Sequence, residues 1–339
     1  MKQSVAFFEL EQWEKEYLKK KLKAYKLVFV DKKLDTATVN LAAKADAIGI
    51  FVYSRITRQL LLKPPKVKLI TTLSTGFDHI DLYATSRRKV AVCNVPAYGD
   101  NTVAEHAFAL LLALARNLVP AVERTRRGNF DLTGLQGIDI KGKTIGIIGT
   151  GRIGSYAARI AKGFQMNVIA FDKFQNQQLA KDLGFAYVKK LDELLARSDV
   201  ISVHAPLTPE TRHLINTKNI LKVKQGCILI NTARGPIVET EAILLGLQKG
   251  ILRGAGLDVL EEECFVKEEK QLLTESFKKT CNLKTALQEH MLLEQDNVLI
   301  TPHSAFYSKE ALQRILDTTV ENINGFFKRK PVNVVKVRV

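Results

Sequence analysis

The feature that most constrains this fold is an alternation of short apolar runs with helical stretches, which begins at Lys141. In chain order the runs are TIGIIG, NVIAFD, FAYV, DVISVHA, CILINTA, GAGLDV and NVLIT. Strands that are joined through helices pair in parallel, and the helices then cover the faces of the sheet. Before residue 96, the runs LVFV, AIGIFV, KLITTL and VAVCNV form a second α/β pattern. We therefore predict two α/β regions, the second with a parallel sheet.

A long apolar helix is predicted between the two patterns, over DNTVAEHAFALLLALARNL. Thr102, followed three residues later by Glu105, forms a capping-box pattern, so we place the start of the helix at Thr102. Most of its faces are apolar, which indicates burial between domains or in a subunit interface. We predict another helix from Lys309 to Asn322 and expect the end of the chain to fold back on the first domain.

The composition is that of a globular protein, with 339 residues, 46% of them hydrophobic and 25% charged. The N-terminus lacks a signal-peptide pattern, and the longest apolar run is about half of a membrane span. We therefore expect a cytoplasmic protein that is not in a membrane. The four cysteines are scattered without the spacing of zinc ligands, so we expect reduced thiols and no metal site.

The formal net charge of +16 raises the question of an acidic partner. The lysines cluster in EKEYLKKKLKAYKLVFVDKK, where Trp13, Tyr17 and Leu22 recur at roughly helical spacing. We expect these lysines on the solvated face of an amphipathic helix. No nucleic-acid-binding motif accompanies the charge, so we predict no nucleic-acid partner. A positive field that attracts small carboxylates and a dinucleotide is compatible with the composition.

A glycine motif follows the first strand of the second pattern, with Gly149, Gly151 and Gly154 in GxGxxG spacing. Such glycines permit a tight turn, the approach of a pyrophosphate to the backbone, and close packing of the following helix. Asp172 ends the next strand, where a carboxylate would accept hydrogen bonds from a ribose and repel a 2′-phosphate. This pattern predicts NAD rather than NADP, although the neighbouring Lys173 weakens that preference.

Polar residues follow several later strands, at the edge where open parallel sheets bind ligands. They are His204 with Pro206, then Arg234, Asp258 and His303. An arginine there offers a planar pair of donors suited to a carboxylate, and a histidine can transfer a proton near neutral pH. A lone histidine is usually a hydrogen-bonded structural residue, so His303 by itself does not indicate catalysis. One carboxylate of the run Glu261 to Glu263 could orient it.

These motifs resemble those of the D-isomer-specific 2-hydroxyacid dehydrogenases over nearly the whole chain. The resemblance rests on STGFDHIDL, CNVPAYGDNTVAEHAFALLLALAR, GIIGTGRIG, HAPLTPETRHLIN, ILINTARGPIVETEAIL, GLDVLEEE and TPHSAFYSKEAL. Within the family, VPAYGDNTVAEHA and PHSAFYSKEAL look most like the D-lactate dehydrogenase branch. The resemblance implies two Rossmann-like domains, one flavodoxin-like and one NAD-binding, with a cleft between them. The catalytic domain would comprise residues 1–100 and 306–339, and the NAD-binding domain residues 101–305.

The resemblance also implies roles for individual residues. Arg234 would hold the substrate carboxylate and polarise the carbonyl, His303 would be the acid–base catalyst, and Glu263 would pair with His303. The other substrate-binding residues implied are Thr75, Gly76, Tyr53, Tyr98 and Phe306. The cofactor-binding residues implied are Gly149, Gly151, Arg152, Ile153, Gly154, Asp172, His204, Pro206, Thr232, Ala233, Asp258 and Val103, the last near the nicotinamide. A homodimer with the helix from Thr102 in its interface is implied as well, with a tetramer as an alternative.

The expected reaction is the reduction of pyruvate to D-lactate with NADH. Larger keto acids that give 2-hydroxyisocaproate or phenyllactate, and glyoxylate or hydroxypyruvate, are alternatives within the family. A protein that senses NAD and acts as a scaffold, similar to the C-terminal-binding corepressors, is an alternative from another class. The segment between Glu263 and His303 is longer than expected for the branch, which leaves the geometry of that pair open.

Overall fold

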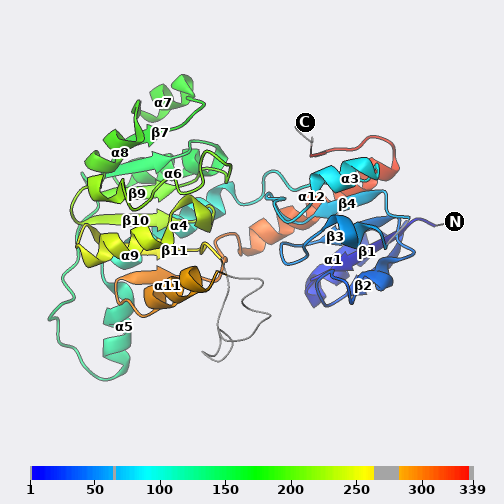
Figure 1. Cartoon of the computed structure of the whole chain (residues 1–339), viewed down its shortest axis with the longest axis horizontal. Helices are drawn as coiled ribbons and strands as arrows, with labels where there is room; N and C mark the ends of the chain where they lie inside the picture. Colours follow the sequence, from blue (N-terminus) through cyan, green and yellow to red (C-terminus); the bar gives the residue numbers. More distant parts are fainter. Residues whose placement is uncertain (1, 64–65, 263–281, 336–339) are drawn as a thin grey trace. The chain divides into compact units, whose positions relative to one another are not determined.

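The computed structural model describes residues 2–63, 66–262 and 282–335 (Figure 1). Their contacts divide the chain into two compact units, described separately below. Unit 1 comprises Met1–Tyr98 and Ser308–Val339, and unit 2 comprises Gly99–Tyr307. Each unit contains one parallel sheet with helices on both faces, so the predicted class of two Rossmann-like domains is confirmed.

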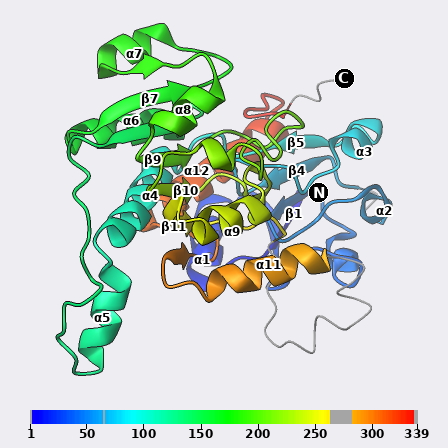
Figure 2. The same cartoon turned by 60° about the vertical axis from the view of Figure 1, so that its left-hand side comes forward.

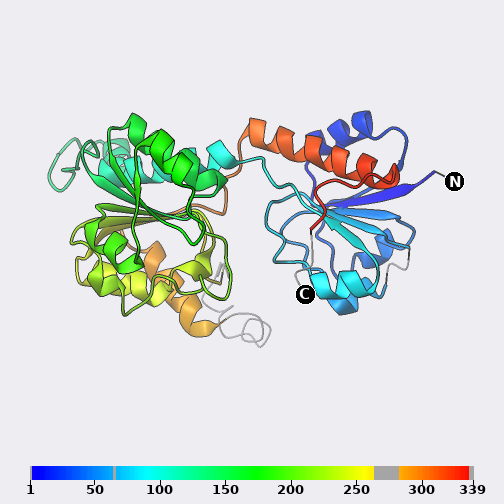
Figure 3. The ribbon, with the colours of Figure 1, turned by 90° about the horizontal axis from the view of Figure 1, so that it is seen from above.

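Unit 1 contains a five-stranded sheet in the order β2-β1-β3-β4-β5, with every neighbouring pair parallel. The strands are β1 (Ser4–Phe8), β2 (Lys26–Val30), β3 (Ala47–Ile50), β4 (Leu69–Thr72) and β5 (Ala91–Cys93). The helices are α1 (Gln12–Lys21), α2 (Arg58–Leu61), α3 (Leu82–Arg87) and α12 (Lys309–Phe327). Figure 3 shows α1 and α12 on one face of this sheet and α3 on the other. Strand β1 is fully buried and was missing from the predicted strands.

Unit 2 contains a seven-stranded parallel sheet in the order β12-β11-β10-β9-β6-β7-β8. Its strands are β6 (Thr144–Ile148), β7 (Asn167–Phe171), β8 (Ala186–Tyr187), β9 (Val200–Val203), β10 (Cys227–Asn231), β11 (Leu252–Leu257) and β12 (Val298–Ile300). All seven correspond to predicted runs. Strand β6 pairs on its two sides with β7 and β9, so the chain reverses its direction of growth across the sheet beside β6. This reversal is the place where doubly wound sheets bind ligands.

Helices cover both faces of the sheet of unit 2 (Figure 2). Helices α4 (Asp100–Ala115) and α6 (Arg152–Gly163) pack together on one face and share a core with the strands. Helices α8 (Leu191–Arg197), α9 (Thr240–Gln248) and α11 (Leu283–Leu293) lie on the other face, over a second core. Helix α7 (Gln177–Leu183) packs beside α6, and α5 (Leu118–Arg126) follows α4.

Helix α4 differs from its prediction at both ends. It begins at Asp100, with Gly99 as its N-cap and no side-chain cap, and Thr102 lies buried inside the first turn. The capping-box prediction at Thr102 was therefore wrong, because the backbone carbonyl of Gly99 already accepts from Val103 N at 2.9 Å. The helix ends at Ala115, whose carbonyl accepts from Ile138 N at 2.7 Å. Most of α4 is buried in the core of unit 2, so its apolar faces pack within one unit, whereas the sequence had indicated burial between domains or in a subunit interface.

The lysine-rich segment forms α1, and its lysines Lys19 to Lys21 are exposed, which confirms the prediction of a solvated basic face. Its buried residues are Glu14 and Leu18, whereas Trp13 is exposed, contrary to the predicted apolar face. Among the helices that the structure describes, none alone has the length and apolar composition of a membrane span. Helices α4 and α5 meet that test only as a pair, and they are bent by 63° at their junction.

Candidate active site

The predicted site residues of unit 2 lie beyond the carboxyl ends of its strands. From β7 across the sheet to β12, the residues that follow the strands are Asp172, Gly149, His204, Arg234, Asp258 and His303. Because all seven strands are parallel, these ends form one edge of the sheet, where open α/β folds bind ligands. The sequence therefore identified one continuous edge. Glu263, the predicted partner of His303, lies outside the described residues.

The glycines of the motif have different structural reasons. Gly149 has φ +90°, and a Cβ there would lie 2.7 Å from Ala205 N. A Cβ at Gly154 would lie 1.9 Å from the carbonyl oxygen of Gly149. The packing of unit 2 itself therefore requires both of these glycines. A Cβ at Gly151, however, would meet nothing within 4 Å, so no contact among the described residues explains this second glycine of the motif.

A bound pyrophosphate explains Gly151, because this glycine is the one that lets the ligand approach the backbone in dinucleotide-binding turns. Gly151 is also the N-cap of α6, and no side chain caps that helix. The first turn of α6 includes no acidic residue. Amide groups at a helix N-terminus attract anions, and here they stand beside the open glycine. Arg152 and Ile153 are the first two residues of α6, and their contact with the cofactor stays a prediction.

Asp172 is fixed beside the glycine loop. Its Oδ2 accepts hydrogen bonds from Thr150 N at 2.6 Å and from Thr150 Oγ1 at 3.0 Å. Its Oδ1 accepts from Phe174 N at 2.8 Å. The carboxylate thus has a defined position one strand away from the glycine motif, where a ribose hydroxyl can reach it. A fixed negative charge at this position disfavours a 2′-phosphate.

Two buried polar atoms at the same edge have no hydrogen-bond partner among the described residues. They are Nδ1 of His204, after β9, and Oγ1 of Thr232, after β10. Nε2 of His204 lies 2.8 Å from Ser202 Oγ, and burial lowers the pKa of this imidazole to about 4. His204 is therefore neutral near pH 7. Buried polar atoms usually have partners, so these two atoms fit an edge that a bound molecule completes.

The backbone around Arg234 is held by Asn231, the buried last residue of β10. Asn231 Nδ2 donates to the carbonyl of Arg234 at 3.0 Å, and Ala233 N donates to Asn231 Oδ1 at 3.0 Å. A Cβ at the next residue, Gly235, would lie 1.8 Å from the carbonyl oxygen of Leu260. The Arg234 segment therefore packs directly on the segment that follows β11. This close packing fixes the backbone from which the Arg234 side chain extends, and Arg234 Nη1 donates to the carbonyl of Ala233 at 2.7 Å.

His303 lies in a tight turn after β12. Its backbone N–H donates to the carbonyl of Thr301 at 2.9 Å across Pro302, and its φ is +54°, which is uncommon outside glycine. Asp258, which is 2% exposed, holds this turn on both sides. Its Oδ1 accepts from Thr301 Oγ1 at 2.5 Å and from Ser304 N at 2.8 Å, and its Oδ2 accepts from Ala305 N at 2.9 Å. The structure thus shows Asp258 as an anchor of the histidine loop, and its predicted cofactor contact stays a prediction.

The remaining predicted residues of unit 2 are Pro206, Val103 and Phe306. Pro206 follows His204 and is exposed, and its carbonyl accepts from Thr211 Oγ1 at 2.6 Å. Val103 is buried in the first half of α4. Phe306 is half-buried, three residues after His303, and packs edge-on against Tyr307.

In unit 1, the predicted substrate residues also follow strands. Thr75 and Gly76 lie after β4, in a turn that side chains of the unit hold in place. Ser74 Oγ donates to the carbonyl of Gly76 at 2.7 Å, and Thr75 Oγ1 donates to the carbonyl of Val95 at 2.8 Å. Asn94 Nδ2 donates to the carbonyl of Thr75 at 2.8 Å. The backbone predicted to bind a carboxylate therefore has a fixed conformation.

Tyr53 follows β3 and is exposed. The turn that carries it is held by Glu9, whose Oε2 accepts from Phe51 N at 3.0 Å and from Ser54 Oγ at 2.5 Å. Burial raises the pKa of Glu9, although these hydrogen bonds oppose the shift. Tyr98 ends the first segment of unit 1, and its carbonyl accepts from Arg314 Nε at 2.6 Å.

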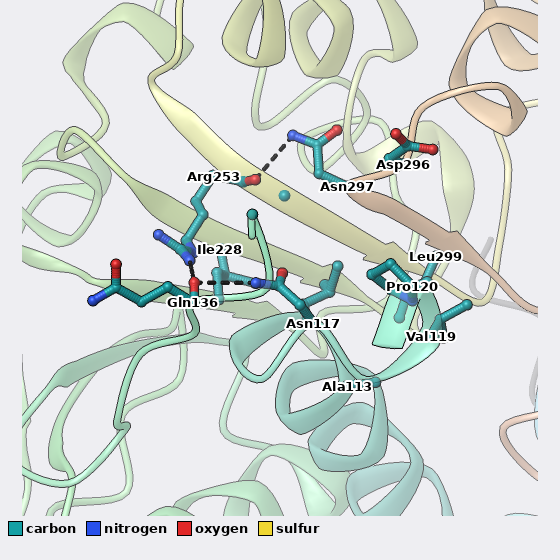
Figure 4. Close-up of a pocket in the computed structure, with 13 residues that line it drawn as sticks. Ala113, Asn117, Val119, Pro120, Gln136, Ile228, Arg253, Asp296, Asn297 and Leu299 are labelled. Atoms are coloured by element: carbon teal, nitrogen blue, oxygen red, sulfur yellow. Dashed lines mark hydrogen bonds between the residues drawn. The ribbon is translucent and has the colours of Figure 1, made fainter. Parts of the chain in front are cut away.

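A cavity of about 180 Å³ lies at the opposite edge of the sheet of unit 2 (Figure 4). Its lining comes from the junction of α4 with α5 and from the first residues of β10 and β11, the amino ends of these strands. Arg253 Nη2 and Asn117 Nδ2 both donate to the carbonyl of Gln136, at 3.0 and 3.1 Å. Since the predicted site residues follow the carboxyl ends, this cavity is separate from the candidate site.

Comparison with known proteins identifies the family. The sequence model for the NAD-binding domain of the D-isomer-specific 2-hydroxyacid dehydrogenases matches residues 108–305. The D-lactate dehydrogenase of Escherichia coli is 37% identical over 331 residues, which are 96% of this chain and 97% of the relative. The chain belongs to this dehydrogenase family. It is therefore an NAD-dependent oxidoreductase, and the glycine loop and Asp172 fit that cofactor.

Two further similarities show the range of this dehydrogenase's relatives. A glyoxylate reductase of Korarchaeum cryptofilum is 34% identical over 299 residues, 87% of this chain and 83% of the relative. The structure of D-lactate dehydrogenase from Aquifex aeolicus, complexed with NAD and lactic acid, is 38% identical and aligns with a TM-score of 0.84 over 96% of each chain. The family is thus shown, whereas the relatives do not agree on one substrate.

Sequence reasoning missed several residues that hold the site together. They are His106, Asn231, Thr301, Ser74 and Glu9. Thr301 stands two residues before His303, so its proximity was a usable signal. His106 lies 195 positions before its partner Thr301, and Glu9 lies 42 positions before Phe51. Nothing local in the sequence indicates such pairs.

Proposed function

We propose that this dehydrogenase reduces pyruvate to D-lactate with NADH. The observation that carries the proposal is the shared carboxyl edge of unit 2, where Arg234 follows β10, His303 follows β12 in a loop held by Asp258, and the dinucleotide loop follows β6. The similarity to the D-lactate dehydrogenase of Escherichia coli, and to a structure described with NAD and lactic acid, supports pyruvate as the substrate.

In the proposed mechanism, bound NADH supplies a hydride to the carbonyl carbon of the keto acid. Arg234 binds the substrate carboxylate through paired N–H donors and so orients the carbonyl. Negative charge develops on the carbonyl oxygen, and His303 donates a proton to that oxygen. Glu263 stabilises the protonated imidazole before the transfer, because an adjacent negative charge favours the cationic form. In the oxidation direction, His303 accepts the proton from the hydroxyl group.

The proposal assigns the substrate side to residues of both units. Backbone amides around Thr75 and Gly76 add hydrogen bonds to the carboxylate, and the internal bonds of that turn fix their direction. Tyr53, Tyr98 and Phe306 contact the substrate side chain. On the cofactor side, the proposal keeps Thr232, Ala233, His204 and Asp258 as contacts of NAD, in addition to the glycine loop.

A different 2-keto acid is the second candidate, because a glyoxylate reductase is among the relatives at 34% identity. The test is the loss of NADH absorbance with pyruvate, glyoxylate, hydroxypyruvate, 2-ketoisocaproate and phenylpyruvate at equal concentrations. The highest kcat/KM with pyruvate is expected. A higher value with glyoxylate or with a branched or aromatic acid would replace pyruvate by that substrate. Binding of NADH without turnover of any of them would favour the scaffold alternative.

We further propose that the chain forms a homodimer. The resemblance implies the helix from Thr102 in the interface, and because most of α4 is buried in unit 2, we add α5 and the segment after it to that interface. Helix α5 contains no buried residue, and Figure 2 shows it projecting from the body of unit 2. Phe130 and Leu132, in the following segment, are 78% and 79% exposed. Large exposed apolar side chains that lie close together favour burial by a partner. Light scattering should give a dimer mass for the wild type and a lower mass for Phe130→Glu combined with Leu132→Glu.

We also propose a cytoplasmic location. Cys93 and Cys227 are free buried thiols, and burial raises the pKa of Cys93 to about 11. Free thiols are typical of reducing compartments. Fractionation of cells that express a tagged copy tests this location.

A further inference from the structure

A hydrogen-bonded chain leads from α4 to the loop of His303. Nε2 of His106, on α4, lies 3.0 Å from Thr301 Oγ1 and 3.6 Å from Asp258 Oδ1. Thr301 Oγ1 in turn donates to Asp258 Oδ1 at 2.5 Å. Asp258 is almost fully buried, and the side chain of His106 is 24% exposed. These three side chains are therefore largely shielded from water, and hydrogen bonds are electrostatically stronger in such an environment.

The count of protons decides which atom donates. A threonine hydroxyl has one proton and can accept through its lone pairs. The proton of Thr301 goes to Asp258, so Thr301 can only accept from His106. The Nε2 atom of His106 must therefore carry a proton. This assignment follows from the contacts and gives the chain one direction, from His106 through Thr301 to Asp258.

The same carboxylate holds the backbone on the far side of His303. Asp258 accepts from the N–H groups of Ser304 and Ala305, so it is bonded to residues before and after the histidine. The turn needs such support, because His303 has φ +54° and a conformation of this kind is strained for a residue with a side chain. If Thr301 lost its donor, Asp258 could shift, and both sides of the turn would move with it.

We propose that His106 is a positioning residue for the acid–base histidine. It donates through Nε2 to Thr301 and so holds the Thr301–Asp258 pair that sets the direction of the His303 side chain. The inference rests on the proposed role of His303. The inference extends the active site to α4, for which the sequence indicated only burial. His106 lies one helical turn after Val103 on this helix.

The test compares His106→Gln with His106→Asn. Glutamine carries an amide nitrogen at about the distance of Nε2, whereas the amide of asparagine is one bond shorter. With pyruvate, or with the best keto acid of the panel, kcat should fall about tenfold or more in His106→Asn, because small misplacements of catalytic groups are costly. His106→Gln should restore most of that loss. The KM for NADH should change much less than kcat in both variants, because the glycine loop after β6 is not part of this hydrogen-bonded chain and Asp258 is only one of the proposed NAD contacts.

A second pair keeps the inference testable if the variants at position 106 fold poorly. Thr301→Val removes the hydroxyl at nearly constant volume, and Thr301→Ser retains it. Thr301→Val should lose as much turnover as His106→Asn, and the double variant should lose no more than either, because both break one chain. His290→Gln, on the exposed face of α11, is the control histidine and should behave like the wild type.

The outcomes distinguish a failure of the proposed function from a failure of the positioning role of His106. If His303→Gln retains turnover, the proposed function fails. If His303→Gln is inactive while His106→Asn and Thr301→Val both turn over at the wild-type rate, only the positioning role of His106 is refuted. Equal losses in His106→Gln and His106→Asn, or a change in the KM for NADH in place of kcat, would also refute it. Thermal unfolding of each variant checks that the compared proteins are folded.

Discussion

The two sheets have the same parallel architecture, and their carboxyl edges are built differently. In unit 1, the turns at this edge are held by the unit's own side chains, such as Ser74 on Gly76 and Glu9 on Phe51. In unit 2, Nδ1 of His204 and Oγ1 of Thr232 are buried without a partner among the described residues, and Gly151 leaves open space. Unit 1 has two such atoms among the described residues, Oε1 of Glu9 at this edge and Oγ1 of Thr319 in α12. The difference indicates that a ligand completes the edge of unit 2, whereas unit 1 presents preformed turns.

The largest expected effect concerns His303 in unit 2, compared with His79 in unit 1. His303→Gln should lower kcat by about 10²-fold or more, the usual scale for loss of general acid–base catalysis. His79→Gln in unit 1 should have a much smaller effect, because no proton transfer is proposed for His79, whose Nε2 lies 3.1 Å from Thr72 Oγ1, and glutamine retains a polar group there. Steady-state kinetics with NADH and the preferred keto acid measure both. Equal losses at the two positions would remove the distinction between the edges.

The second prediction compares two glycines of unit 2. Gly149→Ala should destabilise the fold by about 2 to 3 kcal/mol, since it combines a positive φ with a backbone contact at 2.7 Å. Gly151→Ala should leave the melting temperature unchanged and weaken NADH binding by about tenfold or more, equal to ~1.4 kcal/mol. Thermal unfolding and fluorescence titration with NADH separate these effects. A stable Gly151→Ala with unchanged affinity would argue against a ligand in that space.

The sequence predicted those helices and strands whose pattern of apolar residues can be recognised within a short stretch of chain. All seven strands of unit 2 were found because each apolar run is bounded by its own turn residues. The start of α4 was predicted two residues too late. The helix begins with a backbone hydrogen bond from Val103 N to the Gly99 carbonyl, and a side-chain pattern does not indicate such a bond. Arg234 and His303 were found because position after a strand is a local property. Their supports could not be found in the same way, since His106 and Glu9 meet their partners only after the chain has folded.

The third prediction uses the buried imidazole of unit 2. Burial lowers the pKa of His204 in the folded state to about 4, whereas its ordinary value is 6.5. Between pH 4 and pH 6.5 the unfolded chain binds more protons at His204 than the folded chain does. The contribution of His204 to the free energy of unfolding is therefore fully present above pH 6.5 and is lost as the pH falls toward 4. At pH 5 the loss attributable to His204 should be about 2 kcal/mol.

Denaturant unfolding of the wild type and of His204→Gln at pH 7 and at pH 5 measures this loss. The wild type should lose more stability between the two pH values than the variant does. The variant also loses the hydrogen bond to Ser202, but it does so at both pH values. That loss therefore cancels when the change in stability between pH 7 and pH 5 is compared for the two proteins. Equal pH dependence would show that His204 is not buried in the neutral form, and the edge of unit 2 would then resemble that of unit 1.

The smallest expected effect lies in unit 1, at Glu9. Glu9→Ala removes the acceptor of Phe51 N and Ser54 Oγ, so the turn before Tyr53 should loosen, with a loss of about 1 to 2 kcal/mol of stability. Glu9→Gln keeps an acceptor oxygen and removes the charge. Because burial raises the pKa of Glu9, the folded state disfavours its charged form near neutral pH, and the glutamine variant should be as stable as the wild type or slightly more stable.

The kinetic effect of Glu9 should fall on the substrate and not on the cofactor. A loose turn shifts Tyr53, so Glu9→Ala should raise the KM for the keto acid by about fivefold, near 1 kcal/mol, and leave the Kd for NADH unchanged. Glu9→Gln should keep the wild-type KM. If Glu9→Ala changed NADH affinity and not the KM for the keto acid, the edge of unit 1 would belong to the cofactor side, and the functional contrast between the two sheets would be lost.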